Sequence, residues 1–181
     1  MRLLLLTLSL LLAALPVRAD DRILQFLEDR YTHALMHQVG PPSEGEPVAL
    51  GRADCTDIRS LNRSQTNKAR QLGRIFELSG VHIDVIAASR WCEALATAAL
   101  LELRPVTQEP LLNLLGEDGA DQVDATLALI DGYRPSETAL LVTHAANIEA
   151  LTGRQTQPGD VIVFRLRPGQ DIEIRGAFRL E

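Results

Sequence analysis

The alternation of apolar segments with amphipathic ones limits the fold of this chain more than any other sequence feature. Short apolar stretches suited to buried strands occupy residues 31–36, 81–87, 139–143, 161–166 and 172–175. Apolar residues repeat at helical spacing within 23–27, 69–76, 95–100, 123–130 and 146–151. Strands that alternate with helices specify a mostly parallel sheet with helices on both faces. The sequence therefore predicts an α/β fold, a three-layer sandwich.

The first 19 residues have the pattern of a secretory leader. Arg2 precedes an apolar stretch that is broken at Pro16, and small residues lead to Ala19. The stretch falls short of the ~20 residues that span a bilayer, so a signal peptide accounts for it better than a membrane anchor. We expect cleavage after Ala19, one domain over 20–181, no stable membrane span after cleavage, and a periplasmic or secreted protein.

The charge of the chain argues against some partners. The formal net charge is -6, and losing Arg2 and Arg18 with the leader takes it to -8. An acidic protein of this kind lacks the positive field with which proteins attract nucleic acid, so we expect no nucleic-acid partner. Any anion must be held by local groups.

Two cysteines, Cys55 and Cys92, remain after the leader. An even pair in an oxidising compartment predicts one disulfide, which chain-entropy arguments credit with roughly 3 to 4 kcal/mol. Two free thiols and a redox site are the alternatives. The absence of a Cys-x-x-Cys spacing weakens the redox reading.

Three predicted strand ends carry polar residues, at 36–38, 88–93 and 143–144. Ligands of α/β sheets bind outside the carboxyl ends of the strands. We therefore expect the functional site to form where these three ends meet.

The motifs at these ends resemble those of the histidine phosphatase superfamily, to which the phosphoglycerate mutases belong. Segment 31–36 reads Tyr-Thr-His-Ala-Leu-Met, and 54–62 reads Asp-Cys-Thr-Asp-Ile-Arg-Ser-Leu-Asn. Segment 89–98 reads Ser-Arg-Trp-Cys-Glu-Ala-Leu-Ala-Thr-Ala, and 142–153 reads Val-Thr-His-Ala-Ala-Asn-Ile-Glu-Ala-Leu-Thr-Gly. Their order and spacing match the superfamily over most of the mature chain.

The resemblance implies phosphoryl transfer through a phosphohistidine, and this sequence departs from that chemistry. An ungapped count puts His37 at the superfamily's first arginine, Gln38 at its nucleophilic histidine and Glu93 at its second arginine. A carboxamide nitrogen is not nucleophilic, because its lone pair is delocalised into the carbonyl. A carboxylate in place of a guanidinium turns an attraction of about 4 kcal/mol into a repulsion of similar size. A catalytically inactive pseudophosphatase is the reading that these positions favour.

Two alternatives remain open. In the first, His37 takes over as nucleophile, and Arg59, Arg90 and His144 rebuild a cationic pocket with Asn147 beside them. This reading places Arg90 three residues before Glu93 on one helix face. In the second, His37, Glu93 and His144 form a zinc set, which no local spacing supports. The pattern otherwise points to no cofactor and no metal.

The remaining candidates have structural readings. His33 and His82 are expected to be packed or hydrogen-bonded strand residues, and Trp91 a packing residue beside Cys92. Arg59 is either a phosphate ligand or the partner of a nearby aspartate. The expected partner of the pocket is a phosphate or phosphorylated small molecule, or else a protein.

Overall fold

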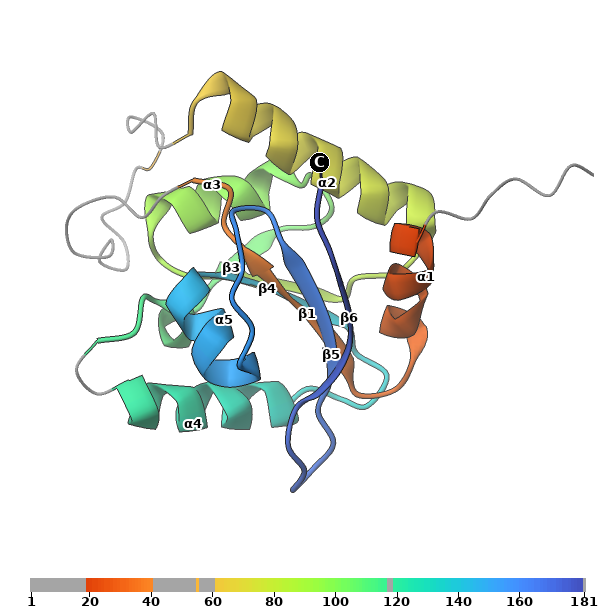
Figure 1. Cartoon of the computed structure of the whole chain (residues 1–181), viewed down its shortest axis with the longest axis vertical. Helices are drawn as coiled ribbons and strands as arrows, with labels where there is room; N and C mark the ends of the chain where they lie inside the picture. Colours follow the sequence, from red (N-terminus) through yellow and green to blue (C-terminus); the bar gives the residue numbers. More distant parts are fainter. Residues whose placement is uncertain (1–18, 41–54, 56–60, 117–118, 181) are drawn as a thin grey trace, which may run out of the picture.

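The computed structural model describes residues 19–40, 55, 61–116 and 119–180 and contains a six-stranded sheet covered by helices on both faces (Figure 1). The strands are β1 (Thr32–His37), β2 (Val85–Ala88), β3 (Val106–Gln108), β4 (Ala139–Thr143), β5 (Val161–Arg165) and β6 (Glu173–Phe178). The helices are α1 (Ala19–Gln25), α2 (Arg63–Ser79), α3 (Cys92–Leu100), α4 (Gly119–Asp131) and α5 (Ala145–Thr152), with single 3-10 turns η1 (Phe26–Glu28) and η2 (Pro110–Leu112). The predicted α/β sandwich is confirmed.

The strand order is β3-β2-β4-β1-β5-β6. β4 pairs in parallel with β1 and β2, and β3 extends the parallel part, whereas β5 and β6 add antiparallel strands at the other edge. β2, β4 and β1 are neighbours that run in one direction, so their carboxyl ends lie side by side. These are the three ends at which the sequence predicted the site.

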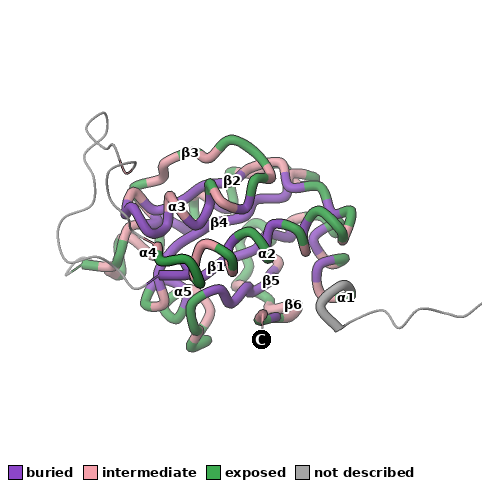
Figure 2. The backbone as a smooth tube through the Cα atoms, turned by 90° about the horizontal axis from the view of Figure 1, so that it is seen from above, coloured by how far each residue is buried: buried purple, intermediate pink, exposed green. Residues whose placement is uncertain are grey.

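Alternate residues of the central strands belong to two separate hydrophobic cores, one on each face of the sheet. Met36 packs with α2 and α3 residues such as Phe76 and Ala94, whereas Leu35 packs on the opposite face with Ile130 of α4 and Ile148 of α5. This is the two-residue period of a strand buried on both faces. Figure 2 shows the result as a buried central sheet between helices whose outer sides are exposed.

Helix α2 begins and ends where the sequence predicted. The Asn62 side chain accepts a hydrogen bond from the Gln65 amide at 3.0 Å, and the Gln65 side chain accepts one from the Asn62 amide at 2.8 Å. This capping box satisfies two of the amides that a helix start leaves unpaired. Gly80 ends the helix with a φ of 73°, a left-handed conformation that glycine adopts without strain.

One predicted strand is shorter than expected, and one strand was not predicted. Residues 81–84 lie outside β2, where the Asp84 carboxylate accepts a hydrogen bond from the Thr138 amide at 2.8 Å. His82 is consequently an exposed side chain near Asp84, so its assignment as a strand residue was wrong. β3 was missed because it has three residues and no apolar run.

Within the described part of the chain, none of the helices has the length and apolar character needed to cross a membrane. The predicted leader over 1–19 falls almost entirely outside the described residues, so it stays a prediction.

Candidate functional site

His37 and Gln38 lie at the carboxyl end of β1. Because side chains alternate along a strand, Gln38 follows Met36 to the face covered by α2 and α3, and His37 points to the other face. Gln38 is fully buried. Its Nε2 donates a hydrogen bond to the Gly40 carbonyl at 3.1 Å, and its Oε1 has no partner. Gln38, which the ungapped count places at the superfamily's nucleophile position, is thus an amide bonded to the backbone.

The His37 ring is bound to the segment that precedes β5. Its Nδ1 lies 3.2 Å from the Thr156 hydroxyl, and its main chain bonds to Gly159 and Asp160. Burial lowers the pKa of His37, although the nearby Asp160 carboxylate acts in the opposite direction. Arg179 holds that carboxylate through two hydrogen bonds. His37 is therefore fixed between β1 and the loop before β5.

His144 follows β4 and is the N-cap residue of α5. Its Nε2 lies 2.8 Å from the Ser89 hydroxyl, its ring meets the Trp91 ring edge-on at 5.7 Å between centroids, and its buried Nδ1 has no partner. Burial, and to a lesser extent the positive charge of His37, lowers the pKa of His144 to about 4. The imidazole is neutral at neutral pH.

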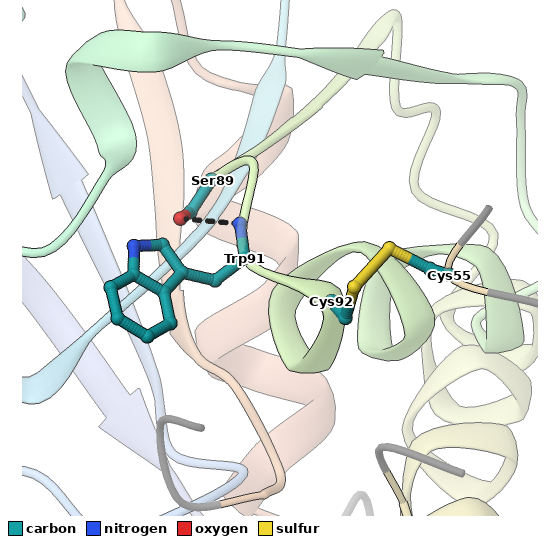
Figure 3. Close-up of a disulfide and its surroundings, with 4 residues drawn as sticks. All are labelled: Cys55, Ser89, Trp91 and Cys92. Carbon is teal, nitrogen blue, oxygen red and sulfur yellow. Dashed lines mark hydrogen bonds between the residues drawn. A yellow bond between two sulfur atoms is a disulfide. The ribbon is translucent and has the colours of Figure 1, made fainter. Parts of the chain in front are cut away.

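The turn between β2 and α3 completes this end of the sheet. Asn113 organises it, because its side-chain oxygen accepts hydrogen bonds from the Arg90 amide at 2.9 Å and the Ser89 hydroxyl at 3.3 Å. The Ser89 hydroxyl in turn accepts one from the Trp91 amide at 3.3 Å (Figure 3). Trp91 is buried, as predicted for a packing residue, and its ring nitrogen has no partner.

Arg90 corrects one expectation. It lies in the turn before α3, whose N-cap is Trp91, so it does not share a helix face with Glu93. Its backbone is held by Asn113, and its Nε is buried without a partner.

Glu93 lies in the first turn of α3 and is 3% exposed. Its carbonyl accepts a hydrogen bond from the Thr97 hydroxyl at 2.7 Å, and that hydroxyl accepts one from the Val39 amide at 3.1 Å. These bonds connect the residues after Gln38 to the helix that carries Glu93. Glu93 is therefore a buried acidic residue in a turn of helix whose main chain is tied to the residues after β1.

The predicted disulfide is present. Cys55 and Cys92 are bonded, with their Cα atoms 5.4 Å apart, and no other cysteine exists in the chain. In Figure 3 the disulfide and the indole of Trp91 project to opposite sides of the chain. The bond thus attaches Cys55 to the first residue of α3, one residue from Glu93.

The other predicted ligands have different positions. Asn147 is buried, and both ends of its amide are used: the oxygen accepts from the Leu115 amide at 3.3 Å, and the nitrogen donates to the Asn113 carbonyl at 2.7 Å. It fixes the loop after η2. Arg59 lies outside the described residues. Asn113 was not predicted, although it is the one polar residue in the apolar run 111–115.

The zinc alternative has no support in the described residues, which contain no group of three or more histidine, cysteine, aspartate or glutamate residues able to hold a metal ion. His37, Glu93 and His144 do not form such a set there. His33 is a buried strand residue, as expected, and its Nδ1 accepts a hydrogen bond from the Ala139 amide at 3.3 Å.

This chain matches known proteins in structure and not in sequence. No protein-family model and no curated protein matches the sequence. The protein histidine phosphatase SixA complexed with tungstate superposes with a TM-score of 0.60 at 14% identity, over 82% of this chain and 96% of that chain. The putative phosphohistidine phosphatase SixA from Nakamurella multipartitia gives a TM-score of 0.60 at 19% identity, over 82% and 95%.

A putative alpha-ribazole-5'-P phosphatase from Escherichia coli gives a TM-score of 0.57 at 14% identity, over 82% of this chain and 94% of that chain. Nearly the whole of each of these proteins is covered. At such low sequence identity the matches show a shared fold. The chain has the fold of the histidine phosphatase superfamily, the superfamily that its motifs resemble.

Proposed function

We propose that this chain is a noncatalytic phosphatase-fold domain, a pseudophosphatase that binds a ligand or partner at the carboxyl ends of β1, β2 and β4. One observation carries the proposal: the residue at the nucleophile position is a buried carboxamide whose nitrogen donates to the Gly40 carbonyl. An amide nitrogen lacks a free lone pair for attack on phosphorus. Gln38 therefore has no route to a phosphoenzyme.

The position of His37 supports the same conclusion. Its ring points away from the Gln38 face and bonds to Thr156, and its backbone is fixed in the β1–β4 ladder opposite Thr143. Moving the imidazole to the Gln38 position requires a one-residue slip of β1, which would turn every buried side chain of that strand to the wrong face. In-line attack tolerates little displacement of the nucleophile.

The electrostatics of the described residues also oppose phosphoryl transfer. A transferring phosphoryl group needs positive charge around its oxygens. Here burial lowers the pKa of both His37 and His144, so neither imidazole supplies positive charge at neutral pH. Glu93 is a buried acidic residue, and Arg90 is the one described arginine of the turn before α3. The arrangement is better suited to holding a ligand than to stabilising a dianionic transition state.

An aryl phosphatase assay tests the proposal. Mature protein, His37→Ala and His144→Ala are each incubated with p-nitrophenyl phosphate from pH 5 to 8, and released nitrophenol is followed. We expect no turnover above buffer in any of the three. Turnover by the unmodified protein that His37→Ala abolishes would establish the rearranged active site instead. Thermal unfolding of each sample serves as the control for folding.

We also propose that the chain acts in the periplasm or outside the cell. The apolar leader and the Cys55–Cys92 disulfide both support export, because disulfides persist in oxidising compartments. Fractionation with N-terminal sequencing should find the mature chain outside the cytoplasm and beginning at Asp20. A full-length chain in the cytoplasm would contradict export.

A further inference from the structure

A cavity lies at the end of the sheet opposite the candidate site. Its volume is about 460 Å³, within the range of roughly 300–1,000 Å³ that small-molecule sites have. It is lined by the last turns of α4 and α5 and by the hairpin between β5 and β6, which Figure 1 shows at the lower edge of the molecule. Leu166 follows β5, and its amide donates to the carbonyl of Tyr31, the residue before β1. The cavity is therefore at the other end of β1 from Gln38.

Part of the cavity lining is apolar. Leu127 of α4, Leu151 of α5 and Ile172 of the hairpin are partly exposed there and pack against the core on this face of the sheet. Leu166 continues the apolar lining and is itself buried. Covering partly exposed hydrocarbon removes it from water, which is favourable in proportion to the area covered. The lining therefore favours a ligand with an apolar body.

Two helices end at the cavity. The last residue of α4 is Asp131 and the last residue of α5 is Thr152, and both residues line the cavity. A helix C-terminus carries a partial negative charge, because its last carbonyls have no partner within the helix. Neither α4 nor α5 has a basic residue in its last turn to offset that charge. Both helix ends therefore favour a cation in the cavity.

The charged side chains of the lining act in the same direction. In the described part of the chain they are Asp131, Asp171 and Arg167, which together give the lining a net charge of -1. The Arg167 guanidinium lies 4.0 Å from the Glu173 carboxylate, which also pairs with Arg175 at 2.6 Å. By contrast, neither aspartate has an ion pair or a side-chain hydrogen bond with any described residue. Two carboxylates at the cavity are thus available to a cationic ligand.

We infer that this cavity binds an organic cation with an apolar body, of the arylalkylamine class. The ammonium group pairs with Asp131 and Asp171, and the hydrocarbon covers Leu127, Leu151 and Ile172. An organic anion of the same shape meets the two carboxylates and the two helix ends, which repel it. The inference goes beyond the proposed function and does not depend on it, because the cavity shares no residue with the carboxyl ends of β1, β2 and β4.

The test uses three probes that share a phenyl group and differ in their polar end: phenethylamine, phenethyl alcohol and hydrocinnamate. Mature protein is titrated with each probe in carbon–proton correlation spectra, and the Ile172 methyl resonance, identified by its loss in Ile172→Val, reports on the cavity. Asp131→Asn, Asp171→Asn and the double variant remove charge and keep the size of the side chains. Asp124→Asn is the matched control, because Asp124 is an exposed residue of α4 outside the cavity lining.

We expect phenethylamine to shift the Ile172 methyl resonance saturably and to bind more tightly than phenethyl alcohol, with hydrocinnamate the weakest. Each single aspartate variant should weaken amine binding about threefold and the double variant about tenfold, as partly exposed ion pairs imply. Asp124→Asn should leave the affinity unchanged. No shift at Ile172, equal binding of amine and alcohol, or an unchanged affinity in the double variant would overturn the inference.

Discussion

Two buried histidines at opposite ends of the β1–β4 pair have the same acid–base behaviour and different surroundings. Burial lowers the pKa of His33 and of His144 to about 4. His33 lies between the rings of Tyr133 and Phe164, at 5.6 and 5.8 Å, and accepts a hydrogen bond from Ala139. His144 leaves Nδ1 without a partner. A depressed pKa therefore occurs in the core as well as at the site, and the two histidines differ in that Nδ1 has a partner in His33 and none in His144.

The Cys55–Cys92 disulfide is the largest difference between the two ends of the β1–β4 pair that mutation can remove, because it lies at the end that carries His144. Replacing Cys55 and Cys92 together by serine should lower the free energy of unfolding by about 4 kcal/mol, since the bond closes a loop with a sequence separation of 37. Guanidinium unfolding measures the change. The unmodified protein in reductant should match the double variant, and equal midpoints with and without the bond would contradict the prediction.

The shared acid–base behaviour predicts a loss of stability in acid. Unfolded histidines bind protons below about pH 6.5, whereas these two bind them only near pH 4 in the folded chain. Each histidine therefore contributes its full share to the free energy of unfolding above about pH 6.5. As the pH falls toward 4, roughly 3 kcal/mol of that free energy is lost for each histidine.

Urea unfolding from pH 8 to pH 4 checks this slope. His33→Leu and His144→Leu should each remove about half of it. His82→Gln, at an exposed position, should leave it unchanged. If the free energy of unfolding still falls as steeply with pH in both His33→Leu and His144→Leu, the pH dependence comes from other groups.

The sharpest contrast lies in the cost of losing each histidine at pH 8. His33→Leu leaves the buried Ala139 amide unpaired and should cost about 1–3 kcal/mol. His144→Leu removes an orphaned nitrogen, and Ser89 keeps Asn113 as a partner, so its cost should be below about 1 kcal/mol. Gln38→Leu removes the unpaired Oε1 and leaves the Gly40 carbonyl without its hydrogen bond, so the two effects offset and its cost should also be below about 1 kcal/mol. Equal costs at both histidines would remove the distinction.

Much of the fold was predictable because its signals are local. The cap at Asn62, the stop at Gly80 and the alternation of Ala34, Leu35 and Met36 between two cores are all written in short segments. The disulfide followed from there being two cysteines. β3 and the true start of β2 were not predictable, since their pairing depends on hydrogen bonds to distant residues such as Thr138 and Glu109.

The position of the candidate residues in the fold was predictable, and their contacts only partly so. Motif order placed Gln38, Glu93 and His144 at one end of the sheet, and the structure has them near the carboxyl ends of β1, β2 and β4. The roles of Asn113 and Asn147, and the placement of Arg90 before α3, depend on side-chain hydrogen bonds across more than 20 residues of sequence. No pattern in one sequence reports which polar atoms remain without a partner.

The central claim is that the protein cannot form a phosphoenzyme, because an amide occupies position 38. A measurement of phosphoenzyme formation tests it most directly. The unmodified mature protein and a variant carrying His37→Arg, Gln38→His and Glu93→Arg are mixed with excess aryl phosphate, quenched, and analysed by intact mass. The account predicts a phosphorylated species in the variant and none in the unmodified protein. Phosphorylation of the unmodified protein, located by peptide mapping to His37, would contradict it.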